Sequence, residues 1–368
     1  MRRRPLVPFA RLVLVLLAAA CHRRSAPIAD TALTAPTATV SGDTAGKIPF
    51  DSAAADSVRR AKLYATIRPK AVNAAVGLPT LEKGDSTGPD ILRLQIMLDG
   101  SGFSAGIMDG HWGHNTTSAL VAFQSAAGLP TTGLPDSTTM AAVIERYGDR
   151  KPIVRYVVTD SDVAGPFVKI PSSPYDQAKL PCMCYQGPVE EMAERFHATP
   201  DLLDQLNDGN LGHLAAGRKL WVPNVVRPTA TAGLARLIIS KTGGHTEGVD
   251  SAGRVLFHFP STLGSQYDPS PTGKFRVTEI TRNPEFHYNP KLYADVPDTK
   301  PDAYFKPGPN SAVGVVWMSL SQPHYGIHGT PHPETIGYAD SHGCVRLTNW
   351  DAEWLSERIR PGTRVEFR

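Results

Sequence analysis

One cysteine and two histidines near the C-terminal end of the chain have types and a spacing suited to covalent chemistry. His342 stands two residues before Cys344, and His328 lies earlier in the same region. Acyl transfer by cysteine needs a thiolate, a base that forms it, N–H donors for the oxyanion and a group that orients the base. Cys344 can supply the sulfur. Either histidine can supply the base, since an imidazole beside a thiol lowers the thiol pKa. The pattern predicts a cysteine nucleophile.

Two other interpretations of these residues are open at this stage. A single cysteine is more often a small buried core residue, and a single histidine is more often structural. The second alternative is a zinc site with four ligands, His328, His332, His342 and Cys344. Pro331 and Pro333 keep the segment of the first two ligands from forming the helix that such spacing normally uses, which weighs against zinc.

The residues around this cysteine resemble the L,D-transpeptidase catalytic domain of the YkuD type. The matching segments, in family order, are 268–275, 308–310, Gly314, Trp317, 325–330, 336–337, 341–347 and 362–365. The resemblance covers residues 233–368 and is most specific at His-Gly-Thr and Ser-His-Gly-Cys. It implies that Cys344 is the nucleophile, that His328 is the base, and that the carbonyl of Gly329 orients the imidazole.

The same resemblance implies roles for the neighbouring residues. The expected oxyanion donors are the N–H groups of His342, Gly343 and Cys344. Three side chains are expected to serve substrate binding, namely Tyr325, Ser341 and Arg346. For Ser341 this means support of the loop. Arg346 is expected to contact an anionic substrate or to clamp the loop, and Tyr325 to line the donor cleft or to pack. Asn349 is expected to cap the helix that follows.

The implied substrate is peptidoglycan. Cys344 would attack the peptide bond before the terminal D-Ala of a tetrapeptide stem, D-Ala would leave, and a thioester would form. A stem amine, an amino acid or a protein lysine would then take the acyl group. Water as the acceptor would give carboxypeptidase side activity. Such a covalent route requires no cofactor and no metal.

The first residues read as an export signal. Arg2, Arg3, Arg4 and Arg11 form a basic head, and the apolar run from Leu12 to Ala20 is too short to cross a bilayer. The run ends in Leu-Ala-Ala-Ala-Cys, which resembles a lipobox with Cys21 as the lipidated residue. The alternative is cleavage after Ala20 without lipid. We expect export to the periplasm or cell envelope, with a lipid anchor in a membrane, which would be the outer membrane if the cell is Gram-negative.

Charge and cysteine usage narrow the class further. Without the four arginines of residues 1–20, the chain has 34 basic residues (38 − 4) and 35 acidic ones, a net charge of −1. This charge balance gives no indication of nucleic-acid binding. Cys182 and Cys184 are too close in sequence for an easy bridge, which leaves Cys344 unpaired in an oxidising compartment. We expect a monomer.

Composition and periodicity divide the rest of the chain. Residues 21–76 are expected to be a tether and linker, with a helix from about Ala53 to Val76. Residues 78–146 carry apolar residues at helical spacing in three runs, the third opened by Asp136 as N-cap. Their motifs, from Leu94-Gln95 through Asp109-Gly110 to Thr132-Gly133, resemble the peptidoglycan-binding domain type 1. This resemblance implies a small helical bundle that binds peptidoglycan.

Residues 154–224 follow the order β-α-α-β and resemble a LysM domain, a glycan-binding fold. An insertion between about Asp160 and Gln186, which holds Cys182 and Cys184, departs from that pattern, so a spacer role stays open. Residues 233–368 form short alternating strands and one clear helix, Trp350 to Ile359. The expected fold is therefore multidomain α+β: a helical bundle, a LysM-like module and a mainly β catalytic domain, sandwich or open barrel.

Overall fold

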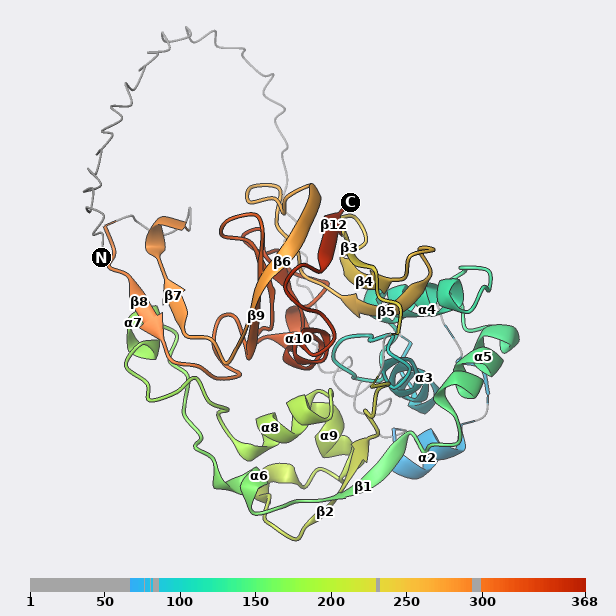
Figure 1. Ribbon diagram of the computed structural model, residues 1–368. Coiled ribbons are helices and arrows are strands. Elements are labelled where there is room, and N and C mark those ends of the chain that lie inside the picture. The colour runs from blue at the N-terminus through green and yellow to red at the C-terminus, as the bar shows by residue number, and fades with distance from the viewer. Residues whose placement is uncertain (1–66, 76, 80, 82–85, 230–231, 293–298) are drawn as a thin grey trace, which may run out of the picture. The chain divides into compact units, whose positions relative to one another are not determined.

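The computed structural model describes residues 67–368 except 76, 80, 82–85, 230–231 and 293–298 (Figure 1). Cys21, the export signal and most of the helix expected from Ala53 to Val76 lie outside the described residues. Within the described part, α2 (Pro69–Ala74) is the end of that stretch. No helix in that part combines the length and the apolar character that crossing a bilayer requires.

The helical bundle contains the three predicted helices, α3 (Pro89–Asp99), α4 (His114–Ala126) and α5 (Ser137–Tyr147). The predicted N-cap of α5 is confirmed, because the Asp136 carboxylate accepts a hydrogen bond from the N–H of Thr139 at 2.8 Å. Phe103 and Phe123 meet edge to face in the bundle core, with ring centroids 5.3 Å apart.

The second module has a two-stranded antiparallel sheet and a core of its own. Its elements are β1 (Ile153–Val157), α6 (Ser161–Ala164), α7 (Pro174–Gln177), α8 (Pro188–Arg195), α9 (Pro200–Leu206), η1 (Leu211–His213) and β2 (Lys219–Pro223). In the β1–β2 pair, Ile153 lies opposite Pro223. The core between the helices and the sheet includes the buried side chains of Met192, Leu203 and Leu220. The order β-α-α-β is thus present, with α6 and α7 added in the predicted insertion.

The third module is built on one eight-stranded sheet with the order β11-β10-β9-β6-β12-β3-β4-β5. Its strands are β3 (Arg236–Ser240), β4 (His245–Val249), β5 (Val255–Pro260), β6 (Gly273–Arg282), β9 (Val316–Leu320), β10 (Gly326–His328), β11 (Val345–Arg346) and β12 (Arg364–Phe367). A separate hairpin pairs β7 (Phe286–Tyr288) with β8 (Ala303–Phe305), and short turns form η2 (Pro290–Leu292) and η3 (Pro333–Thr335). The prediction of a mixed α+β chain with a mainly β third module is confirmed.

The sheet curls until its two ends meet. Directly after β5, Thr262 bridges to Arg346 in β11, and Gly264 bridges to Ser341 just before it. Because all eight strands belong to one sheet and isolated bridges join its ends, the module is a curled, barrel-like sheet rather than a two-sheet sandwich. The curl brings the end of β5 against the segment that carries the candidate nucleophile.

Helix α10 (Asn349–Ser356) lies beside β9 and β10 (Figure 1). The expectation that Asn349 caps this helix is wrong. Thr348 is the cap, since its hydroxyl accepts from the N–H of Asp351 at 3.2 Å. Asn349 is the first helical residue, and its amide instead donates to Glu194 at 3.0 Å and to the carbonyl of Pro309 at 3.1 Å.

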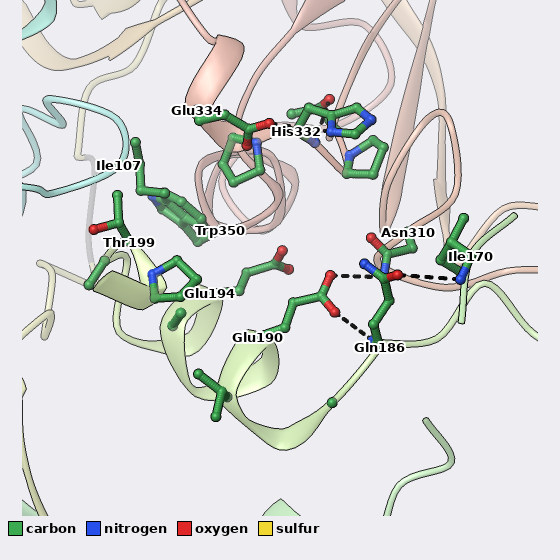
Figure 2. Close-up of a pocket in the computed structure, with 18 of the residues that line it drawn as sticks. Ile107, Ile170, Gln186, Glu190, Glu194, Thr199, Asn310, His332, Glu334 and Trp350 are labelled. Carbon is green, nitrogen blue, oxygen red and sulfur yellow. Dashed lines mark hydrogen bonds and ion pairs between the residues drawn. The ribbon is translucent and has the colours of Figure 1, made fainter. Parts of the chain in front are cut away.

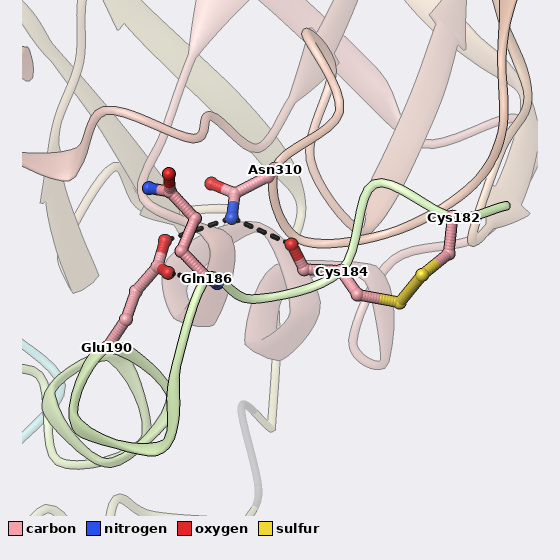
Figure 3. The surroundings of a disulfide bond; sticks show 5 residues. All are labelled: Cys182, Cys184, Gln186, Glu190 and Asn310. Atoms are coloured by element: carbon pink, nitrogen blue, oxygen red, sulfur yellow. Dashed lines mark hydrogen bonds between the residues drawn. A yellow bond between two sulfur atoms is a disulfide. The ribbon is translucent and has the colours of Figure 1, made fainter. Parts of the chain in front are cut away.

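Cys182 and Cys184 form a disulfide (Figure 3), so the expectation that they are too close to bridge is wrong. The pair lies in the insertion, and its neighbours hold that insertion to the third module. Met183 donates to the carbonyl of Pro307 at 3.0 Å. The Asn310 amide donates to the Cys184 carbonyl and to Glu190, each at 2.9 Å. The insertion therefore connects α8 with the third module.

Candidate active site

The candidate base and nucleophile lie on neighbouring parallel strands. His328 is the last residue of β10 and is only 4% exposed. Its partner across the ladder is Arg346 in β11, and Cys344 stands immediately before that strand. Cys344 is thus two residues along the chain from the residue opposite His328. This diagonal relation between adjacent strands brings the two segments side by side.

His328 is held in one tautomer by the backbone. Its Nδ1 lies 2.7 Å from the carbonyl oxygen of Gly329, which can only accept, so Nδ1 carries the proton and Nε2 keeps its lone pair. The ring stacks on Trp317 with centroids 5.3 Å apart. Burial lowers the pKa of His328 to about 4. The imidazole is therefore neutral at neutral pH and able to accept a proton at Nε2.

Cys344 is half-buried and is the free cysteine among the described residues. Its thiol donates to the carbonyl of His324 at 3.6 Å. Burial raises the pKa of the Cys344 thiol. The expectation that a neighbouring imidazole lowers this pKa is therefore wrong for the resting structure. The physical reason is that His328 is itself buried and uncharged, so it offers no positive charge to stabilise a thiolate. The arrangement suits proton transfer during attack rather than a preformed ion pair.

Ser341 and Gly343 shape the loop before the nucleophile. The Ser341 hydroxyl donates to the Cys344 carbonyl at 2.6 Å and accepts from the Gly343 N–H at 3.2 Å. That N–H is thus engaged, and the expectation that Gly343 offers it to an oxyanion is wrong for the resting structure. Gly343 adopts φ +99°, and a Cβ there would lie 2.7 Å from the ring of Tyr325. The loop therefore requires glycine at this position.

The other predicted residues take different positions. His342 is exposed, unlike the buried His328. Tyr325 is half-buried, with its ring against the core of the sheet. Nη1 of Arg346 lies 3.5 Å from the carbonyl of Asp340. The four ligands of the zinc alternative do not form a metal-binding group, since among the described residues that group is a different set.

Ser270 is a site residue that the sequence interpretation missed. It is buried and donates to the Gly343 carbonyl at 2.8 Å, while its hydroxyl accepts from the Gly264 N–H at 2.9 Å. It thus ties the loop before Cys344 to the segment that follows β5. The sequence did contain a clue, because Ser270 lies in the 268–275 segment that resembles the family pattern, but the resemblance assigned this serine no role.

A cavity of about 1250 Å³ opens next to the β10–β11 segments (Figure 2). Its wall includes Thr330 and Arg346 from the catalytic module and several acidic side chains, namely Glu190, Glu194, Asp201 and Glu334. Burial raises the pKa of Glu194 to about 7, although hydrogen bonds from Asn349 and Tyr185 oppose the shift. The cavity therefore offers more carboxylates than cations to whatever enters it.

Comparison with known proteins agrees with this geometry. The L,D-transpeptidase catalytic domain model, YkuD, matches residues 235–367, and a peptidoglycan binding domain model matches residues 87–143. YkuD of Bacillus licheniformis, a protein assigned to the L,D-transpeptidases, is 30% identical over 180 residues, which span 49% of this chain and 92% of that protein. L,D-transpeptidase 1 of Mycobacterium tuberculosis is 25% identical over 174 residues, 43% of this chain and 66% of that protein.

Solved structures give weaker similarity. An L,D-transpeptidase from Xylanimonas cellulosilytica is 19% identical, covers 80% of this chain and 100% of its own, and has a TM-score of 0.34. L,D-transpeptidase 3 of Mycobacterium tuberculosis is 17% identical, covers 42% and 76%, and has a TM-score of 0.30. On the sequence matches, the catalytic module is an L,D-transpeptidase domain joined to a peptidoglycan-binding domain. The chain belongs to the L,D-transpeptidase family.

Proposed function

We propose that the chain carries out peptidoglycan L,D-transpeptidation through an acyl-thioester on Cys344. In the first step Nε2 of His328 takes the thiol proton while the sulfur attacks the carbonyl before the terminal D-Ala of a tetrapeptide stem. The C–N bond breaks, the proton passes to the leaving amine of D-Ala, and a thioester remains. In the second step an acceptor amine attacks the thioester, gives its proton to His328, and restores the thiol.

The observation that carries this proposal is the state of His328. A buried imidazole whose Nδ1 is fixed by the Gly329 carbonyl at 2.7 Å presents a neutral Nε2, which is what a general base requires. The N–H groups of Cys344 and His342 are the proposed oxyanion donors. Arg346 and Tyr325 are proposed to contact the donor stem.

The acidic cavity supports an amine as the acceptor. Carboxylates from α8 and from residues after β10 line it beside Arg346, and they suit the ammonium group of a diamino-acid side chain better than they suit water. Hydrolysis would then be a side activity of the same acyl-enzyme.

The experiment is muropeptide analysis by mass spectrometry after incubation with purified tetrapeptide stems. The wild type should release D-Ala and form cross-linked dimers. Cys344→Ala should form neither product, and His328→Gln should lower turnover by roughly 100-fold or more. His287→Gln is the matched control, because His287 is an exposed histidine paired with Asp302 at 2.7 Å. Full turnover by Cys344→Ala would disprove the assignment.

We further propose where this enzyme works. The matched peptidoglycan-binding domain would hold it at the wall. Residues 154–224 would add a LysM-like glycan contact or serve as a spacer, and Cys21 would carry a lipid after export to the envelope. We also propose that the chain acts as a monomer.

A further inference from the structure

Three metal-ligating side chains gather on one face of the β4–β5 hairpin. His245 and Glu247 are two residues apart on β4, so they point to the same side of the sheet. His258 on β5 is the direct ladder partner of Glu247. One ligand atom from each of the three lies within 4.8 Å of the others. None of them has a part in the transpeptidase mechanism.

One carboxylate oxygen stands between the two imidazoles. Oε1 of Glu247 lies 3.8 Å from Nε2 of His245 and 3.6 Å from Nδ1 of His258. Both separations exceed hydrogen-bond length. The three groups therefore face a common point, and the contacts among them are at ion-pair distance rather than hydrogen-bond distance.

His245 is oriented as metal-binding histidines usually are. Its Nδ1 lies 3.2 Å from the carbonyl oxygen of Gly243, so Nδ1 carries the proton and Nε2 keeps a lone pair toward Glu247. A Cβ on Gly243 would lie 2.5 Å from the His245 ring, so glycine is needed to let the ring sit there. The outer hydrogen bond and the small neighbour together fix the ligand atom.

His258 supplies an independent observation that points to a ligand. Its side chain is 0% exposed, and neither ring nitrogen has a hydrogen-bond partner. Leaving a buried polar atom unsatisfied costs about 1–3 kcal/mol. The backbone of His258 meanwhile joins another module, since its N–H donates to Gly102 at 3.0 Å and its carbonyl accepts from Ser104 at 2.9 Å. A buried imidazole that lacks a hydrogen bond at either ring nitrogen, and that has Glu247 beside it at 3.6 Å, thus lies between the sheet and the helical bundle.

We propose that His245, Glu247 and His258 bind one divalent transition-metal ion, with Zn²⁺ the best match. Two imidazoles and one carboxylate are a common three-ligand zinc set, and water takes the fourth position. With bonds of about 2.1 Å, tetrahedral ligand atoms stand roughly 3.4 Å apart, so the glutamate–histidine separations of 3.6 and 3.8 Å need to shorten only slightly on binding. His245 and Glu247 are half-buried, which gives the ion an entry path. The bound ion would stabilise β5 at the point where residues 102–104 of the helical bundle hydrogen-bond to it.

The test uses the full chain in a Cys344→Ala background, which removes the Cys344 thiol as a competing ligand. Zn²⁺ is titrated by equilibrium dialysis with elemental analysis, and Co²⁺ replaces it as a spectroscopic probe of the coordination. We expect one equivalent of Zn²⁺ and a rise in Tm on binding. His245→Gln, Glu247→Gln and His258→Gln should each weaken binding by at least about tenfold and remove the Tm gain.

His287→Gln is the control, because it removes a histidine near a carboxylate elsewhere on the surface and should change neither readout. If His258→Gln fails to fold, the half-buried His245→Gln still decides the question. Binding of less than one equivalent, or equal affinity in His245→Gln and the control, would overturn the proposal. Neither readout depends on turnover, so failure of this site and failure of the transpeptidase proposal are distinguishable.

Discussion

Replacing Arg227 with alanine should destabilise the chain far more than removing a surface arginine. The Arg227 side chain is 4% exposed and pairs with two fully buried carboxylates. One is Asp99 in α3 of the helical bundle. The other is Asp351 in α10, where Nη2 lies 2.7 Å from Oδ1. His197 from the second module also contacts Asp99, at 3.1 Å. A single buried guanidinium therefore connects elements of separate modules.

The magnitude follows from what the substitution leaves behind. In Arg227→Ala both carboxylates remain buried without their main cation, and breaking a buried pair in this way costs about 3–5 kcal/mol. Burial already raises the pKa of Asp351, so the variant can relieve part of the cost by taking up a proton there. At about 2 °C per kcal/mol for a chain of this size, Tm should fall by roughly 6 °C or more.

The assay is urea unfolding followed by tryptophan fluorescence, with calorimetry for Tm. Arg254→Ala is the matched control, because Arg254 also pairs with an aspartate, Asp250, at 2.7 Å but is 79% exposed. Its loss should cost at most about 1 kcal/mol. Combining Arg227→Met with Asp99→Asn and Asp351→Asn should recover much of the stability, because the buried charges leave together. If Arg227→Ala and Arg254→Ala unfold at the same urea concentration, the reasoning is refuted.

Four further outcomes are expected. Burial lowers the pKa of His328 to about 4, and a base must be neutral to act, so kcat/KM measured by D-Ala release should drop only as the pH falls toward 4. A drop centred near pH 6.5 would contradict this. Because burial raises the pKa of the Cys344 thiol, Cys344 should react with iodoacetamide at pH 7 more slowly than a free thiol; faster labelling would instead support a thiolate–imidazolium pair with His328. Peptide mapping without reduction should find Cys182 linked to Cys184. A palmitate analogue should label the wild type and not Cys21→Ser, and an unlabelled wild type would remove the lipid anchor.

The elements that sequence predicts well here are those with a strong period of their own. The three bundle helices and the strands β3, β5 and β12 carry apolar residues at a spacing or in short runs typical of their type, so the sequence predicts a helical bundle and a mainly β module. Strand β4 reads His-Thr-Glu-Gly-Val, without an apolar run, and β10 and β11 are only three and two residues long. Their strand character comes from the neighbours they pair with, which no local pattern contains.

In the candidate site, too, some features can be predicted from the sequence and others depend on the fold. Motif spacing identified Cys344 and His328 as candidates, because the residue types and the loop glycines are visible in the chain. The direction of the thiol pKa depends on burial and on the charge state of His328, which only the fold determines. The Cys182–Cys184 bridge was misjudged for a similar reason, since chain separation alone does not give the geometry of a loop.

The glycine that follows His328 has a steric reason as well as a chemical one. Its carbonyl fixes the imidazole, while a Cβ on Gly329 would overlap Oδ1 of Asn349, and a Cβ on Gly314 would overlap the same atom. Asn349 cannot easily move aside, because its amide donates to Glu194 at 3.0 Å. A side chain at position 329 would therefore displace the carbonyl that orients the base. The His-Gly-Thr segment thus needs its glycine because the base, the start of α10 and the buried glutamate of α8 converge there.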